Sequence, residues 1–166
     1  GGVTLAWSNL DHEDRFVRYA ARVALEHQDV DRWNNQVFIE KDPQKIIPAS
    51  IALTRMADPS TELQLNILSK LNGIDLNALS LQSQLDLLRS YELSLSRMGK
   101  PRSSMARRIS EKLHTIFPND NNAVNREVSE ILIFLGDKQG TADCLDLMAK
   151  HTAAKTVVDV EMLDDA

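Results

Sequence analysis

The chain of 166 residues contains a single cysteine, Cys144, and aromatic residues make up only 5% of it. One cysteine can form neither an internal disulfide nor a Cys-x-x-Cys metal-binding pair, so we expect Cys144 to be a buried, inert thiol. The scarcity of aromatic residues suits helix-on-helix packing better than the core of a β-sandwich. No run approaches the ~18 consecutive apolar residues that a membrane-spanning helix needs, so we expect no membrane insertion.

Glycine and proline are also scarce, with 6 and 5 residues, and they fall mostly between periodic segments, as in helical bundles and solenoids. Acidic residues outnumber basic ones, 24 to 19, which leaves a net charge of -5. A net negative field repels phosphates and disfavours nucleic-acid binding unless a local basic patch overcomes it. The start of the chain carries no signal-peptide pattern. We interpret Gly1 and Gly2 as a cloning remnant and the chain as a piece of a longer protein.

The sequence is rich in apolar residues at helical spacing, arranged as a recurring unit of two striped helices with a short break between them. Candidate units begin near Asp11, Asp42, Ser80 and Asn122, roughly 31, 38 and 42 residues apart. Self-similarity at this period indicates a solenoid, in which no unit can bury its apolar face alone. We therefore predict an all-α fold, an α-α superhelix of about four antiparallel helical hairpins.

Capping residues and helix breakers set the expected boundaries. The first helix is expected to begin near Asp11 and to turn Phe16, Ala20 and Val23 toward the core. The second unit opens at Asp42, but proline at position 48 would break a helix interior, so we expect its helix proper to begin around Ile47.

Glycine and polar turns divide the rest of the chain. Gly99 and Gly136 are expected to end helices, and Gly140 to open the last complete one. The predicted domains are an N-terminal extension over 1–10, the repeat domain over 11–151, and the start of a truncated further helix over 152–166.

A family resemblance rests on four stretches in matching order: Asp14–Glu26 (DRFVRYAARVALE), 84–91 (QLDLLRSY), 97–101 (RMGKP) and 125–128 (NREV). They resemble HEAT-type repeats in large exported bacterial proteins of planctomycete-like organisms. Such regions are typically joined to a propeller-like, membrane-bound dehydrogenase domain and to a cytochrome c domain. The resemblance implies a HEAT-like solenoid within a periplasmic or cell-envelope parent protein. The haem-attachment motif Cys-x-x-Cys-His is absent, so the resemblance assigns no haem ligand here.

Residues able to perform chemistry are scattered. The four histidines, His12, His27, His114 and His151, lie on different predicted helices, without an i, i+4 partner or an H-E-x-x-H pattern, so we predict structural or solvent-facing roles. No G-x-S-x-G elbow, G-x-G-x-x-G loop or P-loop is present. We predict that this chain is not an enzyme, and we assign no catalytic, metal-binding or cofactor-binding residue and no cofactor.

Basic residues form two clusters. The first, called here the turn cluster, comprises Arg97, Lys100, Arg102, Arg107, Arg108 and Lys112. It surrounds the turn between the fifth and sixth predicted helices and would suit an acidic partner or a phosphate. The simpler interpretation, which we favour, is a solvated face whose cations stabilise a helix C-terminus.

The second cluster, Arg15, Arg18 and Arg22, lies at helical spacing with Tyr19 beside it. We expect these arginines to pair with acids of the next unit, such as Asp42 or Glu62, rather than to bind a ligand.

The leading hypothesis is a non-catalytic repeat module that serves as a protein-interaction scaffold or an interdomain spacer in a larger exported protein. One alternative is a docking domain in a redox protein, which a haem-attachment motif downstream in the reading frame would support. Another is a HEAT-like nucleic-acid binder, whose binding should fall steeply with salt.

The turn cluster yields a first test. Charge reversal at Arg107, Arg108 and Lys112 is expected to weaken a partner interaction while leaving the melting temperature nearly unchanged, because the residues are predicted to be solvent-facing. Equal binding by the wild type and the variant, measured side by side, would remove this cluster as a contact surface.

Overall fold

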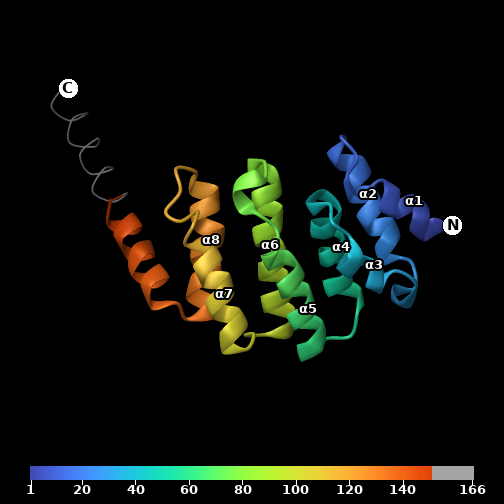
Figure 1. The fold of residues 1–166 in the computed structure, drawn as a ribbon. Coiled ribbons are helices and arrows are strands. Elements are labelled where there is room, and N and C mark those ends of the chain that lie inside the picture. Colours follow the sequence, from blue (N-terminus) through green and yellow to red (C-terminus); the bar gives the residue numbers. More distant parts are fainter. Residues whose placement is uncertain (151–166) are drawn as a thin grey trace, which may run out of the picture. The chain divides into compact units, whose positions relative to one another are not determined.

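The computed structural model describes residues 1–150, and throughout this part every regular element is helical (Figure 1). This confirms the predicted all-α fold. The elements are α1 (Gly2–Ser8), α2 (Arg15–Glu26), the 3-10 turn η1 (Val30–Arg32), α3 (Asn34–Ile39), α4 (Pro43–Met56), α5 (Thr61–Asn72), the 3-10 turn η2 (Leu76–Ala78), α6 (Leu81–Met98), α7 (Ser103–Leu113) and α8 (Asn122–Leu135). Residues 138–150 are also helical. The predicted helix over 152–166 lies outside the described residues.

The chain forms two compact units, Gly1–Ile109 and Ser110–Ala166. The boundary falls within α7.

Side-chain caps explain where the helices begin. The caps that accept a hydrogen bond from a first-turn amide are Asp14, Asp42, Ser60, Ser80 and Asn121. The predicted openings of the second and third units at Asp42 and Ser80 are confirmed, but the cap of α2 is Asp14, three residues after Asp11. His12 Nδ1 accepts the amide hydrogen of Asp14 at 3.0 Å, and Asp11 forms an ion pair with Lys45 at 3.3 Å. A contact within the segment and one to α4 therefore hold the residues before α2 in a non-helical form.

Two glycines end helices as predicted. Gly99 and Gly136 follow α6 and α8 with φ of 80° and 75°, a region that L-residues with a side chain rarely adopt. At the end of α8 the amide of Asp137 donates to the Leu132 carbonyl, which satisfies one of the unpaired carbonyls of the last turn.

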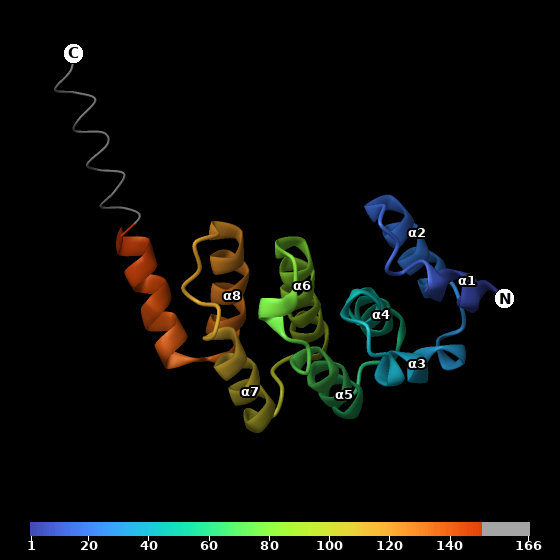
Figure 2. The ribbon, with the colours of Figure 1, turned by 45° about the horizontal axis from the view of Figure 1, so that its top comes forward.

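In the first unit, α4 is the central helix and contacts α2, α3, α5 and α6. The helices α2, α4 and α6 follow one another side by side, as Figure 2 shows. Ala49, Ala52 and Leu53 of α4 are completely buried, which allows these neighbours to approach closely. Large side chains with less than 2% exposure fill the rest of this core: Leu10, Leu25, Trp33, Ile67, Leu68, Leu71, Leu87, Leu88, Tyr91 and Ile109.

The N-terminal segment differs from the predicted extension because Gly2–Ser8 forms α1, which packs against α2. Trp7 is 6% exposed and Leu10 is completely buried. The Trp7 indole Nε1 donates to the Glu40 carboxylate at 2.9 Å. A buried indole with its N–H satisfied anchors this helix.

The predicted core face of α2 is wrong. Phe16 is 66% exposed, whereas Ala21 and Leu25 are the buried residues of this helix. The helix carries apolar residues on two opposite sides, and its neighbours α1 and α4 pack on the side of Ala21 and Leu25. Phe16 and Tyr19 consequently lie at the surface, where the guanidinium groups of Arg15 and Arg22 stack on their rings.

The expected start of the α4 helix around Ile47 is also wrong, because α4 begins at Pro43 and contains Pro48. Pro48 has no amide hydrogen, so the Gln44 carbonyl lacks the donor that an ordinary α-helix provides. Such a proline costs about 3 kcal/mol in an isolated helix. Packing of α4 against four other helices outweighs this cost.

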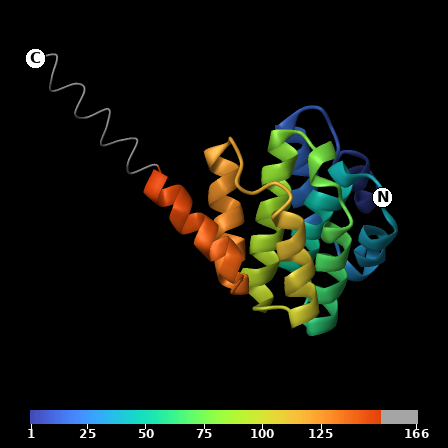
Figure 3. The same cartoon turned by 60° about the vertical axis from the view of Figure 1, so that its left-hand side comes forward.

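In the second unit, α8 and the helix over 138–150 run antiparallel and are joined at Gly136 and Asp137 (Figure 3). Cys144 is 7% exposed, which confirms its predicted burial. The buried apolar residues of this unit also include Leu113, Ile116, Phe117, Val124, Val128, Ile131, Leu132 and Leu135.

The antiparallel pair in the second unit depends on a close approach at Gly140. A Cβ placed there would lie 2.8 Å from Leu132 Cβ and 2.7 Å from Leu132 Cδ1. We predict that Gly140→Ala lowers the free energy of unfolding by about 1–3 kcal/mol, the usual cost of overpacking, measured by chemical denaturation. Gly73→Ala is the control, since a Cβ there meets nothing closer than the Lys70 carbonyl at 3.4 Å. Equal stability of both variants would contradict the tight contact.

The Trp7–Glu40 contact predicts a pH dependence. Burial by itself raises the pKa of Glu40, but hydrogen bonds from the Trp7 indole and from the amides of Asp42 and Lys41, together with the Lys45 charge, bring this pKa below its ordinary value of 4.5. A carboxylate with a lowered folded-state pKa adds stability above its ordinary pKa and loses it as the pH falls through the folded-state value.

We therefore expect Glu40→Gln to be less stable than the wild type at neutral pH, with the difference shrinking below pH 4.5. Urea unfolding at a series of pH values measures this. A difference that stayed constant down to acid pH would show that the Glu40 charge is not involved.

Candidate functional site

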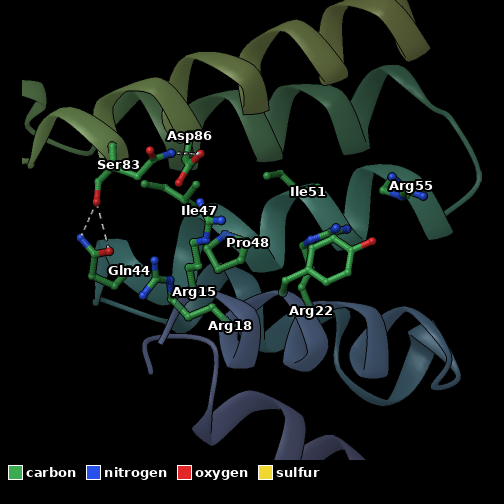
Figure 4. Close-up of a pocket in the computed structure, with 12 residues that line it drawn as sticks. Arg15, Arg18, Arg22, Gln44, Ile47, Pro48, Ile51, Arg55, Ser83 and Asp86 are labelled. Atoms are coloured by element: carbon green, nitrogen blue, oxygen red, sulfur yellow. Dashed lines mark hydrogen bonds between the residues drawn. The ribbon is translucent and has the colours of Figure 1, made fainter. Parts of the chain in front are cut away.

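A groove of about 360 Å³ lies between α2, α4 and α6 in the first unit (Figure 4). The residues that line it are Arg15, Arg18, Tyr19 and Arg22 from α2, Gln44, Ile47, Pro48, Ile51 and Arg55 from α4, and Gln82, Ser83 and Asp86 from α6. We call it the arginine groove. It gathers four of the basic residues of a chain whose net charge is -5.

The floor of the arginine groove is apolar. Ile47, Pro48 and Ile51 come from α4 and lie on the flank of this helix between α2 and α6. Ile47 is buried, and Pro48 and Ile51 are half-buried. The floor can therefore accept an apolar side chain and remove further surface from water.

The spacing of the arginines on α2 explains why they share the groove. Positions 15, 18 and 22 are separated by three and four residues, which places them on one side of a helix. Arg55 reaches the same groove from the C-terminal part of α4, and in Figure 4 it lies at the opposite end from Gln44.

Arg22 and Arg55 share one carboxylate. Glu26 Oε1 accepts from Arg22 Nη1, one turn earlier on α2, and forms an ion pair with Arg55 Nε at 3.3 Å. The side chains of Arg22 and Glu26 are only 14% and 10% exposed, while that of Arg55 is 53% exposed. This three-residue network ties α2 to α4 and carries a single net positive charge.

Arg15 and Arg18 have different partners. Arg18 Nη1 donates to the carbonyls of His12 and Glu13 at 2.6 and 2.9 Å. The Arg15 guanidinium lies 4.7 Å from the centroid of the Phe16 ring. In the part of the chain that the structure describes, neither arginine forms an ion pair with a carboxylate.

Polar contacts close the end of the groove near α6. The Gln44 amide and the Ser83 hydroxyl exchange hydrogen bonds of 3.1 and 3.2 Å, which join α4 to α6. Asp86 is the one acidic residue that lines the groove. It accepts from Gln82 at 3.0 Å and pairs with Arg89 at 3.5 Å. Its charge is therefore compensated from its own helix.

The lining residues suit binding rather than covalent chemistry. They include no histidine and no cysteine, and the single carboxylate of Asp86 cannot form an acid–base pair. Guanidinium groups bind carboxylates and phosphates through two parallel N–H donors. The arginine groove thus places guanidinium donors beside an apolar floor.

The predicted partners of these arginines are wrong. The Asp42 side chain accepts from the Gln44 amide at 2.9 Å and so caps α4, and the acid that pairs with Arg22 is Glu26 of the same helix. Helical spacing in the sequence reveals Arg15, Arg18 and Arg22 as a cluster, but it reveals neither Arg55 nor the floor residues. Only the packing of α2 on α4 brings these together.

The turn cluster is divided between the two units. Arg97, Lys100, Arg102, Arg107 and Arg108 are exposed and belong to the first unit, whereas Lys112 is half-buried and belongs to the second. Arg97 donates to the Ala57 carbonyl at 3.4 Å. The role of this cluster as a partner-binding surface stays a prediction.

The described histidines lie apart from the groove lining. His12 accepts from the Asp14 amide and His27 follows the last residue of α2. His114 Nε2 lies 3.1 Å from Asp137 Oδ1. Among residues 1–150, no group of three or more histidine, cysteine or acidic side chains could hold a metal ion. His151 lies outside the described residues.

Asp137 joins several segments of the second unit. Its carboxylate accepts from the Gly140 amide at 2.6 Å. Burial by itself raises the pKa of Asp137, but the bonds from Gly140, His114 and Ser110, with the His114 charge, bring it below the ordinary range. The residue types of a hydrolytic triad meet here, but the His114 ring and the Ser110 side chain both contact the Asp137 carboxylate. In a triad the carboxylate contacts the histidine, and the histidine in turn contacts the serine hydroxyl, so the arrangement is a different one.

No protein-family model, curated protein or solved structure matches this chain. The resemblance to HEAT-type repeats, with the parent architecture and the cell-envelope location that it implies, therefore stays a prediction. Within residues 1–150, none of the helices combines the length and the apolar character needed to cross a bilayer.

Proposed function

We propose that this chain is a non-catalytic helical-repeat module that binds an acidic segment of a partner protein, or of a neighbouring domain, in the arginine groove. The observation that carries this proposal is the gathering of four guanidinium groups over an apolar floor in a chain of net charge -5. The lack of an acid–base pair or an activated nucleophile in the groove supports a binding role.

An acidic peptide fits the groove better than a nucleic acid. Nucleic-acid binding draws most of its affinity from a track of cations along many phosphates, whereas the arginine groove is short and two of its four arginines are already paired with Glu26. Its floor of Ile47, Pro48 and Ile51 suits an apolar side chain, which a phosphate backbone does not offer.

The arrangement of the first unit supports the repeat character of the module. The first helices of three consecutive helix pairs, α2, α4 and α6, contact one another in chain order, as expected when hairpins stack in a solenoid. We propose that the whole chain is a HEAT-like superhelix that serves as a scaffold or interdomain spacer in a larger exported bacterial protein.

A peptide selection tests the binding function. A random-peptide display library is selected on the immobilised wild-type chain, and the recovered peptides are measured by fluorescence anisotropy. We expect them to combine acidic with apolar residues. Arg15→Glu should weaken their binding at least tenfold, about 1.4 kcal/mol, because it reverses a charge at the groove. Arg32→Glu is the matched control, since Arg32 is an exposed arginine on η1, outside the groove lining.

Two outcomes would refute the proposal. One is a selection that enriches no acidic sequence. The other is binding that Arg15→Glu and Arg32→Glu weaken equally, which would indicate long-range attraction to the chain rather than occupation of the groove.

A further inference from the structure

Two of the four arginines that line the groove already bind a carboxylate of the chain itself, that of Glu26. Glu26 contacts both Arg22 and Arg55 through a single oxygen, Oε1. Contacts between two charged groups are stronger than hydrogen bonds between neutral groups, and Glu26 Oε1 takes part in two of them. Because Arg22 and Glu26 are largely buried, removing one partner would leave the other charge uncompensated. Arg22 and Arg55 are therefore committed to Glu26.

The other two arginines are held in place by weaker partners. Arg18 uses only Nη1 for the carbonyls of His12 and Glu13, so the outer edge of its guanidinium keeps donors for an in-plane acceptor. Arg15 stacks on the Phe16 ring, and a stacked guanidinium still presents its edge N–H groups to an acceptor in its plane. Both side chains are thus oriented before a ligand arrives, which lowers the entropy cost of binding.

The two halves of the groove differ accordingly. Arg15 and Arg18 lie toward Gln44, next to the first turns of α4 and α6, while Arg55 lies at the far end (Figure 4). Ile47, Pro48 and Ile51 run between these ends along α4. A carboxylate at the Gln44 end would have an apolar surface immediately beside it.

We propose that Arg15 and Arg18 are the specificity-determining pair that receives an acidic side chain of the bound peptide. Arg22 and Arg55 instead bind Glu26 and so hold α2 beside α4, which maintains the groove. An apolar side chain adjacent to the acidic residue of the peptide rests on Ile47, Pro48 and Ile51. This assignment depends on the proposed function, because it names the part of the ligand that each half of the groove contacts.

Arginine side-chain NMR tests the assignment on the whole chain. The probe is a blocked peptide of alternating leucine and glutamate, and the matched control peptide has glutamine in place of glutamate. The Nε–Hε signals of Arg15 and Arg18 should shift during titration with the glutamate peptide and stay in place with the glutamine peptide. The signals of Arg22 and Arg55 should move little, because Glu26 occupies these side chains.

Substitutions separate the two pairs. Arg15→Gln and Arg18→Lys should each weaken peptide binding about tenfold, since lysine keeps the charge but loses the two-donor geometry. Arg55→Gln and the surface control Arg32→Gln should each change affinity less than about twofold. Glu26→Gln should strengthen binding and allow the Arg22 and Arg55 signals to respond, because it removes the internal competitor. Thermal unfolding of each variant checks that the fold is intact.

The outcomes distinguish this assignment from the proposed function. If the glutamate peptide fails to bind the wild type at all, the proposed function fails and the assignment with it. If the peptide binds but Arg55→Gln weakens it as much as Arg15→Gln, only the assignment fails. A single-stranded DNA oligonucleotide that shifts the same signals more strongly than the peptide would overturn both in favour of a nucleic-acid partner.

Discussion

The burial of α4 on several sides is the constraint on which the first unit depends. Four helices contact it, and they can do so because Ala49, Ser50 and Ala52 occupy little space and are fully buried. Between α2 and α6, one flank of this helix lines the groove. That flank carries Ile47, Pro48, Ile51 and Arg55, so the floor of the groove is a direct consequence of how α4 is packed.

Packing against α4 also decides the orientation of α2. This helix has apolar residues on opposite sides, and either side could in principle face a core. The small Ala21 and the buried Leu25 face its neighbours, which leaves Phe16 and Tyr19 exposed. In this orientation the arginines of α2 lie at the boundary between the buried and exposed sides. They therefore border the groove over α4 instead of pointing into bulk solvent.

Local signals in the sequence predicted more of the helices than of their contacts. Ser80, Gly99 and Gly136 mark helix ends because capping and positive φ depend only on neighbouring residues. The interior Pro48 could not be predicted correctly, since its cost is offset by helices distant in the sequence. The core side of α2 was equally inaccessible, because an apolar stripe shows that a helix can bury a face but not which neighbour will cover it.

The site could be predicted only in part for the same reason. Helical spacing brings Arg15, Arg18 and Arg22 together, so the sequence reveals three of the four arginines. Arg55 lies more than thirty residues further along and joins them through tertiary packing alone. The pairing with Glu26, at i, i+4 from Arg22, was available from the sequence as a common helix contact. Its connection to Arg55 depends on the side-by-side placement of α2 and α4.

The four arginines of the groove have partners of different charge, and this supports our proposal that only one end of the groove accepts a ligand. A partly buried carboxylate between two guanidinium groups, as at Glu26, cannot be displaced without leaving a charge unpaired in a poorly solvated place. A backbone carbonyl or an aromatic face, as at Arg18 and Arg15, is a neutral partner that holds the guanidinium without neutralising it. An incoming carboxylate at that end adds a charge-assisted contact and leaves the existing ones in place. The arginines at the two ends of the groove therefore differ in the charge of their nearest acceptor, and this difference is the basis on which we propose a structural role for one pair and a recognition role for the other.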